Sequence, residues 1–169
     1  MMQTTQPRID PDAALALEEQ VCFALSVAAR NVVAVYKPIL EPLGLTHPQY
    51  LVMLAMWQHE PVSVRELSTL LHLDPATLSP LLKRLEASGL LRRERNAEDE
   101  RALAVTLTER GRDLRSEALT VPPAVMSRLD MGLEELVALR ESLHQVITAT
   151  RTALAEPVAG RAEPVAVRA

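Results

Sequence analysis

The chain has 169 residues, a net charge of −4 and 48% apolar residues, of which only one Trp, two Tyr and one Phe are aromatic. This length gives a single sizeable core, which must consist of Leu, Val, Ala and Met and is therefore mostly helical. One cysteine excludes an intrachain disulfide, and neither a signal peptide nor an apolar run near the roughly 20 residues of a membrane span is visible, so we expect a cytoplasmic protein with no membrane contact.

The N-terminal part is predicted to be a flexible arm, residues 1–11, followed by a long helix over about 12–43. Asp12 can cap this helix, and its apolar residues recur at helical spacing. Thr46 caps a second helix, over about 48–59, which is apolar nearly all round. This pattern predicts that the second helix lies in the centre of the domain.

Two short helices separated by a three-residue turn come next. The capping-box pair Ser63 and Glu66 begins the first of them, with a hydroxyl at the cap and a carboxylate three residues on. Asp74 caps the second helix, which covers about 75–88 and carries Pro75 in its first turn, where a missing N–H costs nothing. The pair has the spacing of a helix-turn-helix.

After this helix the apolar residues no longer recur at helical spacing but alternate with polar ones. Residues 91–95 and 103–107 alternate as two strands around the polar turn 96–100, which predicts a β-hairpin. Helices fill most of 109–155, and the tail 156–169, with two prolines, a glycine and scattered charge, is expected to be disordered. The predicted fold is mostly α with a small β-hairpin wing, a winged helix-turn-helix.

Such a unit suits DNA. Small and hydroxyl side chains at the start of the second helix allow close approach to base edges in the major groove, and basic residues beyond them can reach phosphate or the minor groove. Nine basic residues balance nine acidic ones between Glu60 and Arg112, so local clusters must provide the contacts. Asp99 is expected to pair with an arginine and shape the wing. The candidate DNA-binding residues are Asp74, Pro75, Ala76, Thr77, Ser79, Lys83, Arg84, Arg93, Arg95 and Arg101.

Several motifs of this unit occur together in one known family. They are the run Leu73-Asp-Pro-Ala-Thr-Leu-Ser-Pro-Leu-Leu-Lys-Arg-Leu-Glu86, Gly89-Leu-Leu, Asp99-Glu-Arg101 and Leu107-Thr-Glu-Arg-Gly111. With them the sequence resembles the MarR family of winged-helix regulators over about residues 15–150. The resemblance implies a homodimer on double-stranded DNA with a near-palindromic operator. It also implies one domain over 12–155, with a DNA-binding lobe at 46–108 and dimerisation helices at 12–45 and 109–155.

Three further stretches resemble the organic-hydroperoxide-sensing, OhrR-like one-cysteine branch. They are Val21-Cys-Phe-Ala-Leu25, Tyr36-Lys-Pro-Ile-Leu40 and Thr46-His-Pro-Gln-Tyr-Leu51. In that branch peroxide oxidises the cysteine early in the first helix and repression is released, which implies a sensing role for Cys22. Tyr36 lies fourteen residues, about 21 Å, further along the same helix. The two side chains could meet only across a two-fold axis, and the resemblance implies that Tyr36 of the second subunit donates a hydrogen bond to the sulfur.

The sequence departs from this branch at two positions, where His47 and Ser26 replace tyrosines. His47 could bond the sulfur and, if protonated, would favour the thiolate; alternatively the sensing site is altered, or His47 is only a neighbour of the helix cap. No Lys, Arg or His lies within four residues of Cys22, so any activating group must come from elsewhere. Oxidised Cys22 would need a low-molecular-weight thiol to form a disulfide.

Two other interpretations stay open. The same fold could respond to a small aromatic ligand bound without a covalent bond, with Cys22 only packing, as free cysteines often do. The chain could also be an enzyme or a protein-interaction module. However, we find no phosphate-binding glycine loop and no metal-ligand spacing, and the four histidines are scattered. We therefore expect no enzyme, no metal and no cofactor, and favour a repressor that organic hydroperoxide releases from DNA.

Overall fold

The structure is a computed structural model that describes residues 15–95 and 103–155. The predicted arm, 1–11, and the predicted tail, 156–169, lie outside the described residues. The chain divides into two compact units, with the boundary between Val125 and Met126, where the sequence predicts one domain over 12–155. The first unit holds everything from the first helix through the wing, and each unit is described by itself.

Helix α1 spans Val21–Leu40 and begins later than the sequence predicts. The backbone at Gln20 is extended, with ψ 118°, so the helix cannot continue back toward Asp12; a single 3-10 turn, Leu17–Glu19, precedes it. A second 3-10 turn, η3 (Glu41–Leu43), follows α1, and Gly44 ends it in the left-handed conformation at φ 67°.

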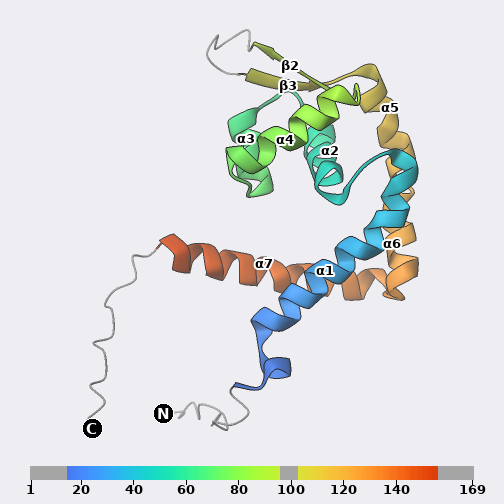
Figure 1. Ribbon diagram of the computed structural model, residues 1–169. Coiled ribbons are helices and arrows are strands. Elements are labelled where there is room, and N and C mark those ends of the chain that lie inside the picture. The colour runs from blue at the N-terminus through green and yellow to red at the C-terminus, as the bar shows by residue number, and fades with distance from the viewer. Residues whose placement is uncertain (1–14, 96–102, 156–169) are drawn as a thin grey trace. The chain divides into compact units, whose positions relative to one another are not determined.

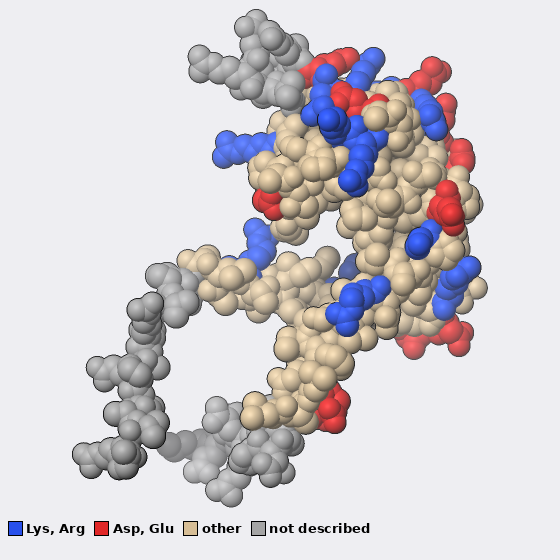
Figure 2. Space-filling view, viewed as in Figure 1, with Lys and Arg blue, Asp and Glu red and all other residues tan. Residues whose placement is uncertain are grey.

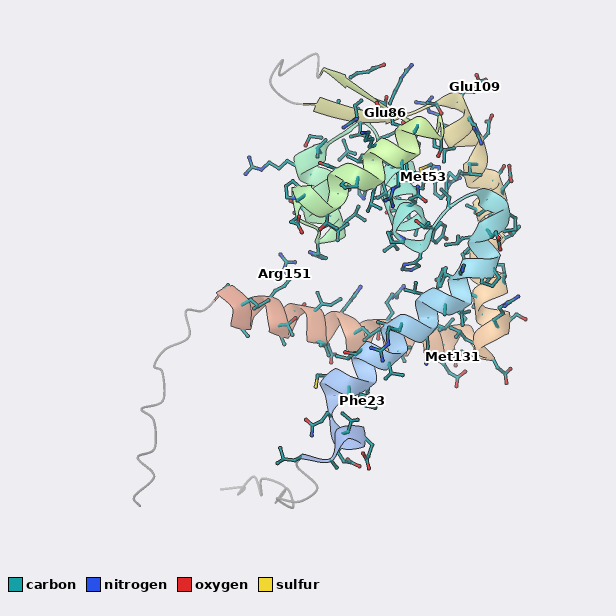
Figure 3. All side chains as sticks on the ribbon, in the orientation of Figure 1. Phe23, Met53, Glu86, Glu109, Met131 and Arg151 are labelled. Atoms are coloured by element: carbon teal, nitrogen blue, oxygen red, sulfur yellow. The ribbon has the colours of Figure 1, made fainter. Side chains whose placement is uncertain are left out.

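The continuous helical stretch Val21–Leu43 is long and apolar as a whole, a property that core helices of soluble proteins share with membrane spans, and it does not contradict the expectation of no membrane span. Among the described residues it is the one helix that is long enough and apolar enough, by length and composition alone. The expectation counted uninterrupted apolar runs, which Arg30 and Lys37 break, whereas an average over the helix tolerates both charges. Val21 and Phe23 are exposed on this helix, and Leu40 is its only buried residue, so the described residues leave much of its apolar surface uncovered (Phe23 is labelled in Figure 3).

The helix-turn-helix and wing form as predicted, with small shifts at the ends of elements (Figure 1). Helix α2 lies beneath the other elements and contributes buried Val52, Met53 and Met56 to the core. The elements in chain order are α2 (His47–His59), β1 (Val62–Ser63), α3 (Val64–Leu71), α4 (Pro75–Ala87), β2 (Leu91–Arg95) and β3 (Leu103–Leu107).

The sheet has three strands in the order β1-β3-β2, not the two that the sequence predicts. Val62 in β1 pairs with Val105 of β3, and Leu91 in β2 pairs with Leu107. The missed strand has only two residues, too few to show an alternating pattern. Because β3 is central, β2 is an edge strand and its outer N–H groups face no other strand.

The predicted caps at Ser63 and Asp74 are confirmed, whereas Asp12, predicted to cap the first helix, lies outside the described residues. The Ser63 hydroxyl accepts a hydrogen bond from the Glu66 N–H at 3.1 Å, while the Glu66 carboxylate accepts one from the Ser63 N–H at 2.9 Å. At the start of α4, Asp74 accepts a hydrogen bond from the Thr77 N–H at 2.8 Å. These local bonds set where the two helices of the helix-turn-helix begin.

Three helices follow the wing: α5 (Glu109–Ala118), α6 (Val121–Leu129) and α7 (Leu133–Ala155). Val121-Pro-Pro follows the end of α5 and forms the first turn of α6, where prolines lose no helical hydrogen bond. In the second unit α7 has no buried residue. Its exposed apolar side chains are Leu133, Leu139, Val146, Ile147 and Leu154.

A close backbone contact joins α5 to the end of α4. A Cβ on Gly111 would overlap the carbonyl oxygen of Leu90 and would lie 3.2 Å from Leu107 Cδ2. The Gly111 carbonyl in turn accepts a 2.8 Å hydrogen bond from the indole Nε1 of Trp57, in α2. Only glycine fits here, and the contact ties three elements together.

The substitution Gly111→Ala should therefore destabilise the protein by about 2–3 kcal/mol, because the backbone must move to admit the methyl group. The measurement is the thermal unfolding midpoint at one fixed protein concentration. Gly132→Ala is the matched control, since a Cβ there would meet only Glu135 Oε2 at 3.5 Å. That control should cost at most about 1 kcal/mol. Equal midpoints for the two variants would contradict the role assigned to Gly111.

Candidate nucleic-acid interface and sensing residues

Helix α4 has one buried and one open face. Leu78, Leu82 and Leu85 are fully buried on its inner side, and they seat the helix on the core. The predicted base-facing positions Pro75, Ala76, Thr77 and Ser79 are all exposed. The outer face at the start of α4 thus consists of small side chains, as close approach to base edges requires.

Asp74 serves α4 through its cap. One carboxylate oxygen accepts from the Thr77 N–H and the other from the Thr77 hydroxyl, each at 2.8 Å. These hydrogen bonds hold the pKa of Asp74 below its usual range, and the one from the Thr77 backbone N–H has the largest effect. The group is therefore ionised at neutral pH. An ionised carboxylate that is fully engaged in the cap orients the start of the helix and does not suit a phosphate.

Lys83 and Arg84 extend from the exposed side of the same helix. Within the described part of the chain neither forms an ion pair, so their charges are available to phosphate. Figure 2 shows basic and acidic side chains intermingled over this lobe, which fits the equal numbers of the two between Glu60 and Arg112. Availability for DNA therefore depends on which basic residues already have acidic partners.

The arginines of the wing differ in this respect. Arg93 is bound to Glu86 of α4, with Nη2 to Oε2 at 2.5 Å, and Arg92 is bound to Glu94 at 2.9 Å. The predicted wing residues Asp99 and Arg101, and the side chain of Arg95, lie outside the described residues. Of the predicted wing contacts, only Arg93 is placed, and the structure places it against a carboxylate.

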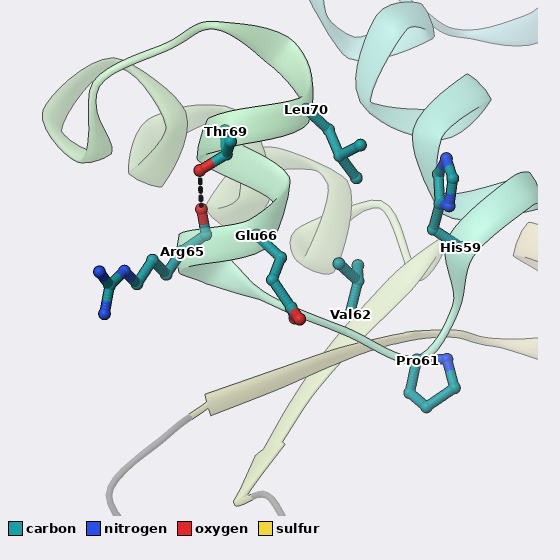
Figure 4. A pocket seen from close by; sticks show the side chains of 7 residues that line it. All are labelled: His59, Pro61, Val62, Arg65, Glu66, Thr69 and Leu70. Atoms are coloured by element: carbon teal, nitrogen blue, oxygen red, sulfur yellow. Dashed lines mark hydrogen bonds between the residues drawn. The ribbon is translucent and has the colours of Figure 1, made fainter.

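Arg65 is an exposed basic residue of the helix-turn-helix that the sequence reasoning did not single out. It belongs to α3, and its backbone carbonyl accepts a hydrogen bond from the Thr69 hydroxyl at 3.1 Å (Figure 4). It borders a pocket of about 450 Å³ whose other lining residues include His59, Leu70 and Pro61. The sequence signal that could have identified Arg65 is its position inside the capping box Ser63-Val-Arg-Glu66, at the start of the first helix of the helix-turn-helix.

Cys22 lies in the first turn of α1 and is exposed. Ser26, which replaces a tyrosine of the sensing branch, donates its hydroxyl hydrogen bond to the Cys22 carbonyl oxygen at 2.7 Å. The Ser26 hydroxyl is thus engaged with the backbone and not with the sulfur. Within one chain, Cys22 is not brought together with Tyr36 or His47.

Tyr36 and His47 do meet. Their rings stand edge to face with centroids 5.0 Å apart, and the ring of Tyr50 lies 6.1 Å from that of Tyr36. Burial lowers the pKa of His47 and raises that of Tyr36, so the imidazole is held toward its neutral form and the phenol keeps its proton. These three residues, called here the aromatic cluster, join α1 to the start of α2.

His47 also lines a pocket of about 550 Å³ at the junction of α1 and α2. Its apolar wall includes Val33, Ala34, Leu45 and Pro48, and its charged residues are Arg30, Lys37 and Glu41. The size lies in the range of small-molecule sites, and an apolar wall beside two cations suits an amphipathic acid.

A capped helix with an open face of small side chains, unpaired cations and a wing defines a winged-helix DNA-binding regulator. The model of the family "Transcriptional regulator SarA/Rot" matches residues 34–118. The organic hydroperoxide resistance transcriptional regulator of Bacillus subtilis is 39% identical over 131 residues, 78% of this chain and 89% of that protein. The chain belongs to this family of MarR-like transcriptional regulators, which are DNA-binding proteins and not enzymes.

Solved structures agree with this assignment. Reduced AbfR bound to DNA superposes with a TM-score of 0.67 at 32% identity, covering 82% of this chain and 97% of that one. CouR from Rhodococcus jostii bound to p-coumaroyl-CoA gives a TM-score of 0.66 at 27% identity, covering 78% and 94%. AbfR has also been solved in overoxidised and disulfide forms.

The unpaired cations of α4 can be tested through salt dependence. Lys83→Gln should weaken DNA binding and reduce the slope of log K against log salt by about 0.9 for each phosphate that the variant no longer neutralises. Arg140→Gln, which removes the same charge from α7 of the second unit, is the control and should leave the slope unchanged. An unaltered slope in Lys83→Gln would mean that Lys83 does not bind phosphate.

The lowered pKa of His47 predicts a pH dependence of stability. The unfolded chain takes up a proton at His47 before the folded protein does, so the contribution of neutral His47 is complete above about pH 6.5 and is lost as pH falls toward the lower folded pKa. Urea unfolding of His47→Gln between pH 7.5 and 5.5 (about one unit either side) should show a smaller loss than the wild type. His144→Gln, on exposed α7, should keep the wild-type dependence.

Proposed function

We propose that this regulator is a cytoplasmic homodimeric repressor that leaves a near-palindromic operator when organic hydroperoxide oxidises Cys22. The observation that carries the proposal is an exposed Cys22, the only cysteine of the chain, on a helix whose apolar surface is largely uncovered. The name of the Bacillus subtilis relative and the reduced and overoxidised forms of AbfR support a redox signal of this kind.

A second copy of α1 would complete the sensing site. If two α1 helices cross antiparallel about a two-fold axis, Cys22 of each can lie beside Tyr36 of the other, because the 14-residue separation is about 21 Å of helix. The exposed Val21 and Val33 would be covered in the same contact. Since Tyr36 already touches His47, the partner's cysteine would meet the aromatic cluster and not a lone phenol.

The chemistry then follows from a single thiol. The Cys22 thiolate attacks one peroxide oxygen, the O–O bond breaks, sulfur is oxidised to sulfenic acid, and the hydroperoxide leaves as an alcohol after taking a proton. A low-molecular-weight thiol can condense with the sulfenic acid, forming a mixed disulfide and releasing water. Tyr36, whose pKa burial raises, remains a hydrogen-bond donor to the sulfur or its new oxygen throughout.

The pocket at the α1–α2 junction favours a second candidate function. An aromatic acid could bind there, with its carboxylate near Arg30 and Lys37 and its ring against Val33 and Leu45, and Cys22 would then be structural. The CouR structure with p-coumaroyl-CoA shows a relative of this fold holding an aromatic acyl ligand.

Cys22→Ser separates the two candidates. Under the hydroperoxide proposal, cumene hydroperoxide releases the wild type from DNA and leaves the variant bound, because serine cannot be oxidised. Whole-protein mass should show one added oxygen on the wild type, or a thiol adduct when a small thiol is present, and neither on Cys22→Ser. Release of both proteins by hydroperoxide would refute the sensing role. Release of both only by an aromatic acid would establish the second candidate.

A further inference from the structure

An ion pair and an additional backbone hydrogen bond connect α4, the recognition helix, to the first strand of the wing. Glu86 lies in the last turn of α4, and Arg93 lies in the middle of β2. Arg93 Nε and Nη2 both donate to Glu86 Oε2, at 2.9 and 2.5 Å. The Arg93 backbone N–H donates to Glu86 Oε1 at 3.2 Å. Figure 3 marks Glu86 where α4 meets the hairpin.

The backbone bond explains why a carboxylate is useful here. Strand β2 is at the edge of the sheet, so an N–H that points away from β3 has no strand partner. Glu86 provides an acceptor for the outward N–H of Arg93 and simultaneously holds its guanidinium. The side chain of α4 thus takes the place of a neighbouring strand at this position, and it fixes the first strand of the wing to the helix.

The turn between them is fixed from the other side. The Thr108 hydroxyl donates to the Gly89 carbonyl at 2.6 Å, and Arg110 Nη1 donates to the Ser88 carbonyl at 2.9 Å. These bonds hold the turn but not the strand beyond it. The Glu86–Arg93 pair acts on β2 itself, four residues past Gly89, where the direction of the wing is set.

The charges argue against direct DNA contact by this pair. Both side chains are about one-third exposed, and the hydrogen bonds from Arg93 hold the pKa of Glu86 below its usual range, so the carboxylate is ionised. A carboxylate beside DNA repels phosphate, and an arginine held by two bonds is not free to reach it. A basic contact would be stronger without Glu86.

We propose that Glu86 and Arg93 are positioning residues for DNA binding, which lock the wing at a fixed angle to α4 so that both reach the duplex together. Arg93 acts through Glu86 and not by binding phosphate. The pair therefore determines affinity through geometry, in contrast to Lys83 and Arg84 on the exposed side of α4.

Glu86→Ala distinguishes positioning from contact because the two predict opposite signs. The probe is a duplex selected from a random library by the full-length wild-type protein. Positioning predicts that Glu86→Ala and Arg93→Met each weaken binding about tenfold with the slope of log K against log salt unchanged. Direct contact predicts tighter binding and a steeper slope for Glu86→Ala, and a flatter slope for Arg93→Met; either result would overturn the proposal.

Two further variants make the test specific. Glu94→Ala removes an exposed carboxylate from the same strand, which pairs with Arg92 among the described residues, and should not weaken binding. The double exchange Glu86→Arg with Arg93→Glu restores the ion pair but not the acceptor for the backbone N–H of residue 93, because arginine only donates. It should therefore regain part, and not all, of the affinity that each single exchange loses. A double exchange no better than its worse single variant would count against the proposal.

Amide hydrogen exchange provides an independent measurement. In Glu86→Ala the N–H groups of Arg93 and Glu94 should exchange faster while those of Val52 and Met53 in α2 stay protected, since the wing loosens and the core does not. Unchanged exchange at the wing would exclude positioning. Should Arg93→Met not fold, Arg93→Lys replaces it: lysine keeps the charge but not the forked geometry, so positioning predicts weaker binding and contact predicts little change.

Discussion

The DNA-reading unit depends on the close approach of Gly111 to the carbonyl of Leu90. At this point the start of α5 and the turn between α4 and β2 share one set of hydrogen bonds. The Thr108 N–H donates to the Leu90 carbonyl at 3.1 Å, and the Thr108 hydroxyl accepts from the Gly111 N–H at 3.0 Å. No side chain could be accommodated between them. The position of α5 relative to the turn after α4 is therefore set by backbone contact, which leaves little freedom for either to shift alone.

Helix α2 connects this joint to the aromatic cluster. His47 at its first position touches Tyr36, and Trp57 near its end donates to the Gly111 carbonyl. Between them Met53 and Met56 are fully buried, so the helix is seated in the core along its length. If oxidation at Cys22 acts on the aromatic cluster, as the proposed function requires, α2 offers a rigid, continuous element from there to the recognition helix.

Local sequence signals predicted most of the fold, but they could not predict elements that depend on pairing between distant residues. Caps at Ser63 and Asp74 and the glycine turn at 89 act over three or four residues, so the sequence could place the helix-turn-helix and wing. Strand β1 was missed because a two-residue strand exists only through its pairing with β3. The start of α1 was misplaced because Asp12 offers a capping side chain, whereas the extended backbone at Gln20 decides where the helix begins.

The site shows the same division at the level of charge. The basic residues could be counted from the sequence. The sequence could not show which of them lack an acidic partner, because carboxylates that lie elsewhere in the fold form ion pairs with some of them. Glu60 illustrates this: burial disfavours its ionisation, yet hydrogen bonds from Arg112 and from the Leu107 N–H outweigh burial and lower its pKa. Its partner Arg112 is thereby structural.

Two arginines of the wing are also paired with carboxylates: Arg93 with Glu86 across the turn after α4, and Arg92 with Glu94 along β2. A neutral lobe can therefore still present positive charge to DNA, since the acidic residues neutralise arginines that hold the fold together. What remains unpaired among the described residues of α3 and α4 are Arg65, Lys83 and Arg84. Between Glu60 and Arg112, where acidic and basic residues are equal in number, the basic residues thus fall into two groups: those that build the structure and those available to phosphate. Only the three-dimensional pairing distinguishes the two groups.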